Sequence, residues 1–92
     1  HELVSAITAP CDVLVSGIYR DDPNRSFIIR INNTAKRDEL GREQFDFEGI
    51  GPIRFVKLID DRIAVFQYDG DREGFFDLAD NKVEFRPYDP DE

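Results

Sequence analysis

Acidic residues recur at the spacing of a calcium-binding loop in the segment DGDREGFFDLAD. Counted from Asp69, carboxylates stand at loop positions 1, 3, 5, 9 and 12 and a glycine at position 6, which is the EF-hand pattern with Asp80 in place of the final Glu. An EF-hand needs flanking helices, whereas β-branched and aromatic residues precede this segment and Pro87 follows it. We therefore expect no metal site here, and predict a tight Asp-Gly hairpin followed by a strand in which Phe76 and Leu78 point inward.

Other residue types that support catalysis do not form a recognisable constellation. Asp60 and Asp61 are adjacent carboxylates, but neighbouring acids in a turn point apart into water and make no acid–base pair without a cleft. Cys11 is the only cysteine and His1 the only histidine, so no Cys–His pair is evident. No GxGxxG or GxxxxGK phosphate loop is present. We expect no enzymatic activity, no cofactor and no small-molecule substrate.

Arg25 stands out in the segment DDPNRS. Asp22 suits the first corner of a type I turn, Pro23 presets φ at the second and Asn24 tolerates the third. Such a turn has no need of an arginine at the next position. Two explanations remain open: a surface ion pair with Asp21 or Asp22, or a contact with a partner protein.

Composition narrows the class of partner. The chain has 92 residues, 35% of them charged, and a formal net charge of −8. Its length indicates a single domain. Nucleic acids and anionic membrane surfaces are disfavoured as partners, because binding them depends on basic patches. The alternative explanation for the acidity is a solvated surface that keeps a small domain soluble.

Short apolar or alternating runs between turn residues predict strands throughout the chain. The fold class is therefore all-β: six or seven short antiparallel strands in two packed three-stranded sheets, as a small sandwich or half-barrel. The expected strands cover residues 12–19, 27–32, 44–48, 53–59, 62–68 and 74–78, with a possible seventh at 82–86.

The remaining segments are expected to lie outside the sheets. Residues 1–10 are predicted as an N-terminal extension or linker that could pair as an edge strand or merely cover one, residues 11–86 as the β domain and residues 87–92 as a C-terminal linker. Residues 33–42 have no sustained periodicity and are expected to form a loop.

Alternation also predicts which faces are buried. The strand at residues 12–19 is apolar on both faces, which suggests cover on both sides. In the strand at residues 27–32, Phe27, Ile29 and Ile31 are expected to point inward, and Arg30 to lie on the opposite, wetter face.

The order of these motifs resembles the periplasmic homology-region domain of protein C, an inner-membrane component of bacterial type II secretion systems. That family shows an apolar strand ending in Gly, an Asp-Pro-x-Arg-Ser turn, an apolar strand, a Gly-containing turn, an Asp-Arg-Val/Ile turn and a Gly-x-x-Glu segment. The matching segments are VLVSG, DPNRS, FII, GIGPIRFVKLI, DRIAVF and GDREGFFDL. The likeness covers roughly residues 12–78.

The resemblance implies a periplasmic adaptor that binds the N-terminal domain of the outer-membrane secretin during protein export. Such a domain is tethered to the inner membrane by a single transmembrane segment, which would lie outside this chain. Two alternatives remain open: a β domain like that of the type IV pilus assembly lipoprotein, and an unrelated extracytoplasmic β domain with a structural role.

The expected partner-binding residues combine the first predicted strand with the neighbouring turn. If the strand containing Val13, Leu14, Val15 and Ser16 lies at a sheet edge, its free backbone groups could accept a strand from the partner. Arg25, at the adjacent turn, would then offer a forked donor to a carboxylate of the partner.

Overall fold

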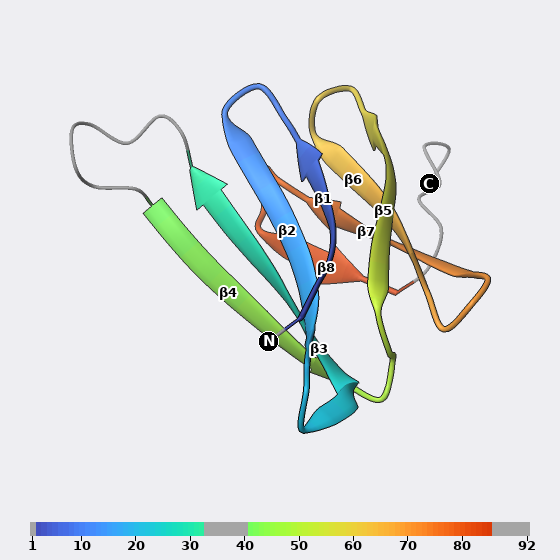
Figure 1. The fold of residues 1–92 in the computed structure, drawn as a ribbon. Helices are drawn as coiled ribbons and strands as arrows, with labels where there is room; N and C mark the ends of the chain where they lie inside the picture. Colours follow the sequence, from blue (N-terminus) through green and yellow to red (C-terminus); the bar gives the residue numbers. More distant parts are fainter. Residues whose placement is uncertain (1, 33–40, 86–92) are drawn as a thin grey trace.

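Eight antiparallel strands form two four-stranded sheets that are not closed into a barrel (Figure 1). The computed structural model describes residues 2–32 and 41–85. The strands of the first sheet are, in spatial order, β1 (Glu2–Thr8), β2 (Asp12–Tyr19), β3 (Asp22–Asn32) and β4 (Gly41–Glu48). Those of the second sheet are β5 (Ile53–Ile59), β6 (Ile63–Tyr68), β7 (Arg72–Asp77) and β8 (Lys82–Glu84).

The predicted all-β class is confirmed, but the prediction of three-stranded sheets is wrong. Each sheet gains one strand at an edge. The segment predicted as an extension or linker contributes β1, which pairs along β2, and residues 82–84 form β8 beside β7. Of the predicted loop, residues 33–40 lie outside the described residues and the rest belongs to β4. The predicted C-terminal linker also lies outside them.

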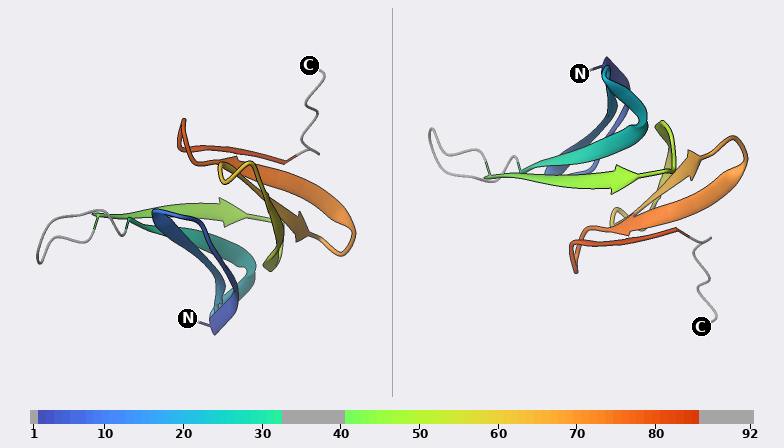
Figure 2. Two further views of the ribbon diagram at one scale, coloured as in Figure 1. Left: turned by 90° about the horizontal axis from the view of Figure 1, so that it is seen from above. Right: turned by 90° about the horizontal axis from the view of Figure 1, so that it is seen from below.

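The core lies between the two sheets. Its fully buried side chains include Leu14 and Ile28 from the first sheet and Phe66 and Phe76 from the second. Figure 2 shows the sheets as two layers, with the blue to green strands on one side and the yellow to red strands on the other. The predicted inward orientation of Phe76 is confirmed.

The predicted orientation of β3 is reversed. Ile28 is fully buried in the core, whereas Ile29 and Ile31 are only half-buried and lie opposite Val15 and Val13 of β2, away from the second sheet. The alternation misleads because the inner row of β3 also contains polar residues. They include Ser26, which is buried, and Arg30.

Serine side chains join the two sheets where β1 approaches β5. Ser16 donates a 2.6 Å hydrogen bond from Oγ to the main-chain oxygen of Ile53, and the main-chain N–H of Phe55 donates to Ser5 Oγ at 2.9 Å. The ladders of both β1 and β5 contain a register irregularity nearby. The sheets are therefore linked there through side chains, without a continuous ladder.

Two tight hairpins connect β5 with β6 and β6 with β7 in the second sheet. At the first, Asp60 and Asp61 both have positive φ, 52° and 54°, a conformation that Asp tolerates better than most residues. At the second, Asp69 and Gly70 have φ of 51° and 85°. The predicted Asp-Gly hairpin is confirmed, as is the burial of Leu78 beyond the following strand.

Candidate protein-docking surface

The face of the first sheet that is turned away from the second sheet, here called the outer face, carries the predicted partner residue Arg25. Residues opposite one another in an antiparallel ladder project to the same side of the sheet, so outward-pointing side chains of neighbouring strands lie next to one another on this face. On β3 the row contains Arg25, Phe27, Ile29 and Ile31.

Arg25 is held by a tyrosine and not by the acids of its own turn. Its guanidinium carbon lies 4.7 Å from the centre of the Tyr19 ring, within the range of a cation–π contact. Its Nε lies 3.9 Å from a carboxylate oxygen of Glu48, a loose pair in which the Arg25 side chain stays 44% exposed. The predicted pairing with Asp21 or Asp22 is thus replaced by contacts to β2 and β4.

The local turn explains why those acids are not the partners. The hairpin between β2 and β3 turns at residues 20–21, and Asp22 already pairs with Tyr19 in the ladder. The Asp22 carboxylate accepts a 3.1 Å hydrogen bond from the N–H of Asn24. The extra residues 23–25 form an irregularity in the ladder, and Arg25 emerges from it onto the outer face.

A hydrogen-bond network fixes the tyrosine beneath Arg25. The Tyr19 hydroxyl donates to Asp46 Oδ1 at 2.6 Å and accepts from Gln44 Nε2 at 2.9 Å. This hydrogen bond to Asp46 is the main cause that raises the pKa of Tyr19 above its ordinary value, and the same bond lowers the pKa of Asp46. The ring also packs edge-on against Phe27, with centroids 5.4 Å apart.

An apolar strip continues from this cluster along the outer face. It consists of half-buried Val13 and Val15 on β2 and Ile29 and Ile31 on β3. Val15, the two isoleucines and Arg42 of β4 line a shallow hollow of about 330 Å³. The surface therefore offers apolar contact area with arginines at its border, a combination typical of protein interfaces.

Two of the predicted partner residues do not reach this surface. Leu14 and Ser16 have no exposed area, because they point into the space between the sheets. The edge position on which strand addition depended is not found, since β1 pairs with one side of β2 and β3 with the other. Backbone strand addition to β2 is accordingly blocked, and of the predicted set Val13, Val15 and Arg25 remain accessible.

Sequence reasoning missed Tyr19, Gln44 and Asp46. Gln44 and Asp46 lie about twenty residues beyond Arg25 in the chain, and only the pairing of β3 with β4 brings them to it. The alternation in QFDFE indicates that Gln44 and Asp46 lie on the opposite face from Phe45 and Phe47. It does not indicate which residues of a neighbouring strand they lie beside.

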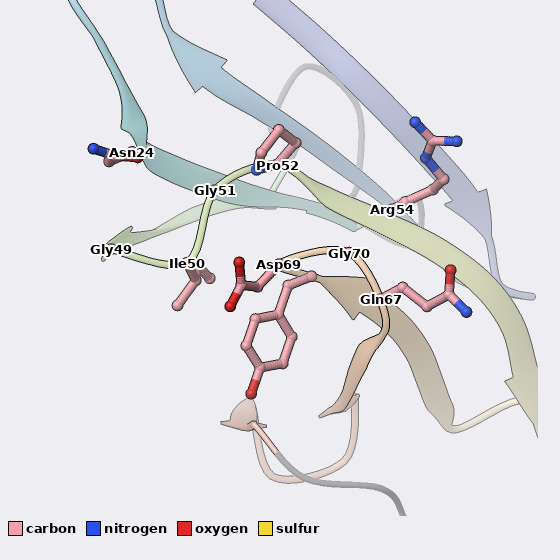
Figure 3. Close-up of a pocket in the computed structure, with 10 residues that line it drawn as sticks. Asn24, Gly49, Ile50, Gly51, Pro52, Arg54, Gln67, Asp69 and Gly70 are labelled. Atoms are coloured by element: carbon pink, nitrogen blue, oxygen red, sulfur yellow. The ribbon is translucent and has the colours of Figure 1, made fainter.

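A second hollow, of about 570 Å³, lies between the residues 49–52 turn and the β6–β7 hairpin (Figure 3). In Figure 3 Asp69 lies near Ile50, while Arg54 and Gln67 extend to another side. The hydroxyl of Tyr68 donates to the main-chain oxygen of Phe85. The lining contains one carboxylate and neither histidine nor cysteine, so it contains no side-chain pair suited to acid–base or nucleophilic catalysis.

Asp69, Asp77 and Asp80 of the calcium-like segment each form an ion pair with an arginine. Asp77 binds Arg62 in a bidentate manner, with both N–O distances 3.0 Å, and Asp69 lies 3.8 Å from Arg72. Within residues 2–32 and 41–85, no group of three or more His, Cys, Asp or Glu side chains is arranged to hold a metal ion. In the same part of the chain, no helix is long and apolar enough to cross a membrane.

No known protein family matches the chain, and no curated protein or solved structure shows significant similarity to it.

Proposed function

We propose that this domain is a protein-docking module that binds through the outer face of its first sheet. The observation that carries the proposal is the placement of Arg25, which is stacked on Tyr19, only loosely paired and bordered by an apolar strip. Arginine and tyrosine are enriched among the residues that dominate binding energy. A stacked guanidinium also loses less conformational entropy when it binds a carboxylate.

The partner we propose is the N-terminal periplasmic domain of an outer-membrane secretin, with this chain as the periplasmic adaptor domain of a type II secretion inner-membrane protein. The proposal rests on the sequence resemblance. The order of the elements supports it: VLVSG lies in β2, FII in β3, IRFVKLI in β5 and IAVF in β6. These strands follow one another as antiparallel hairpins within each sheet, although the resemblance implies three-stranded sheets and each sheet here has four strands.

The surface determines how such a partner would bind. Because β2 is paired on both sides, we expect side-chain contacts to Val13, Val15 and Arg25 in place of strand addition. We expect an interface limited to these side chains to bury less than about 1,200 Å², which is usual for transient complexes. We therefore expect micromolar affinity.

Titration calorimetry with the secretin domain, at about 100 µM protein to suit micromolar affinity, tests the proposal. Arg25→Glu should abolish the binding heat, because it places a second carboxylate where the partner's carboxylate would bind. Arg54→Glu is the matched control: it makes the same charge change at an exposed position on β5, and should leave binding intact. Circular dichroism of each variant verifies the fold.

The outcomes test the binding site and the identity of the partner separately. Binding by the wild type that Arg25→Glu leaves unchanged would exclude Arg25 from the interface. Absence of binding by the wild type would exclude the secretin domain as partner and favour a pilus-assembly or structural role.

A further inference from the structure

The four sheet edges are not equally protected against pairing with another chain. The edges of β1 and β5 approach one another, contain irregularities and are bridged by Ser5. The edge strand β8 has only three residues. In contrast, β4 has eight residues and pairs with β3 in unbroken register. Short length, bulges, cover and charged side chains are the usual means of blocking an edge. Among the described residues, β4 is neither short nor bulged nor covered, and its protection consists of its charged side chains.

The side chains of β4 divide between its two faces. Phe45 and Phe47 point toward the second sheet, where their rings pack edge-on against Phe76 and Phe85 at 5.2 and 5.3 Å. The outer face of β4 carries four polar side chains. In chain order they are Arg42, Gln44, Asp46 and Glu48.

This outer row is complementary to itself when reversed. If two copies of β4 run antiparallel and are centred on Phe45, Arg42 of each copy lies opposite Glu48 of the other. Gln44 likewise lies opposite Asp46. The sequence positions within each pair differ by an even number, so both members lie on the same face, as an antiparallel ladder requires. The arrangement gives two opposite-charge pairs and two amide–carboxylate pairs.

Arg42 supplies a second reason for this register. The acids of β4 already have contacts within the chain: Asp46 with Tyr19, Glu43 with Asn81 and Glu48 loosely with Arg25. Arg42 makes no ion pair within the described residues. A shift of the register by two residues in either direction loses the Arg42–Glu48 match. Centred on Asp46 the ladder is shorter, and centred on Gln44 it keeps its length but places Glu48 opposite a position outside β4.

We propose that β4 pairs antiparallel with β4 of a second copy of this chain about a two-fold axis at Phe45, which joins two first sheets into one eight-stranded sheet. The second copy is the favoured occupant because the charges match at every outer position of the strand. The proposal is independent of the secretin partner, since it uses the edge of β4 and not the outer face around Val13 and Val15. A single strand pair is a small interface, so the dimer is expected to dissociate in the micromolar range.

Sedimentation of the purified chain from about 5 to about 500 µM, which brackets micromolar affinity, tests the proposal. The wild type should shift from monomer to dimer. Arg42→Glu and Glu48→Arg should each weaken association by roughly tenfold or more, because each converts two opposite-charge pairs into two like-charge pairs. An equimolar mixture of the two variants should associate again, since every outer charge pair is then opposite in sign.

Arg72→Glu controls for net charge: it makes the same charge change as Arg42→Glu on β7, which is not an edge strand, and should associate like the wild type. If Glu48→Arg does not fold by circular dichroism, Glu48→Gln replaces it and should weaken association several-fold. A wild type that remains monomeric over the whole range overturns the proposal. So does a mixture of the two variants that associates no better than either alone.

Discussion

Arg30 on β3 forms an ion pair with Asp12 on β2, with Nε 3.0 Å from Oδ1, inside the space between the two sheets. Their side chains are only 16% and 8% exposed. Nη1 of Arg30 also donates to the main-chain oxygen of Leu78 at 2.8 Å and to Asn81 Oδ1 at 2.7 Å. One guanidinium thus connects two strands of the first sheet with the end of β7.

We predict that Arg30→Met lowers the free energy of unfolding by about 3 kcal/mol, because it leaves a buried carboxylate and a main-chain oxygen without their donor. Urea unfolding measures the loss. The double variant Arg30→Met, Asp12→Asn should lose less than the single variant, since it buries no charge. A loss below about 1 kcal/mol in the single variant, a value typical of exposed pairs, would show that the link contributes little.

The strands of this fold were predictable because their turns have local causes. The Asp69–Gly70 hairpin follows from the freedom of Gly to adopt positive φ, and the apolar alternation after it identified Phe76 as a core residue. The orientation of β3 was not predictable in the same way. Its outer row, with Ile29 and Ile31, is more apolar than its inner row, and the inner polar residue Arg30 is accommodated by partners from distant strands.

The candidate site was predictable only in part, for a related reason. Arg25 could be singled out because the type I turn expected around Pro23 does not require an arginine, although the hairpin turns at residues 20–21 and residues 23–25 form an irregularity of β3. Its contacts with Tyr19 and Glu48 depend on the three-residue irregularity in β3 and on the β3–β4 register. Neither is encoded in a short stretch of sequence. The same holds for β1, whose pairing with β2 removes the edge that the sequence suggested for strand addition.

Gly74 on β7 is required by close packing. A Cβ built there would lie 2.5 Å from the main-chain oxygen of Glu84 and 2.8 Å from Cζ of Phe66. We predict that Gly74→Ala destabilises the fold by about 1–3 kcal/mol, the usual cost of overpacking, because the Phe66 ring is fully buried in the core and cannot move aside freely.

Thermal unfolding checks this prediction against Gly17→Ala. The Cβ added at Gly17 would meet the Phe27 ring and the main-chain oxygen of Glu2. Glu2 and Glu84 both lie at the ends of edge strands, so the difference rests on the rings. Phe66 is fully buried in the core between the sheets, whereas Phe27 lies on the outer face, and the loss at Gly17 should therefore be smaller. Equal losses, or a larger one at Gly17, would contradict this interpretation of the two contacts.

The bidentate pair between Arg62 and Asp77 should make stability depend on pH. The hydrogen bond from Arg62 is the main cause that lowers the pKa of Asp77 in the folded chain, and the Asp77 carboxylate also accepts from the N–H of Ala79 at 2.9 Å. The unfolded state therefore binds a proton more readily than the folded state. The contribution of this pair is present above the unfolded pKa and is lost as the pH falls through the folded pKa.

We predict that the wild type loses more stability than Arg62→Gln between about pH 5 and pH 2, and that the difference between them stays within about 1 kcal/mol, because the Arg62 side chain is 53% exposed and screened by solvent. Urea unfolding of both proteins across this range gives the comparison. The difference between them is the informative quantity, because protonation of the other acids also relieves repulsion within a chain of net charge −8. That relief acts nearly equally on both proteins. Parallel pH profiles would therefore mean that Arg62 does not shift the titration of Asp77, and that its contacts with this carboxylate only orient the β5–β6 hairpin.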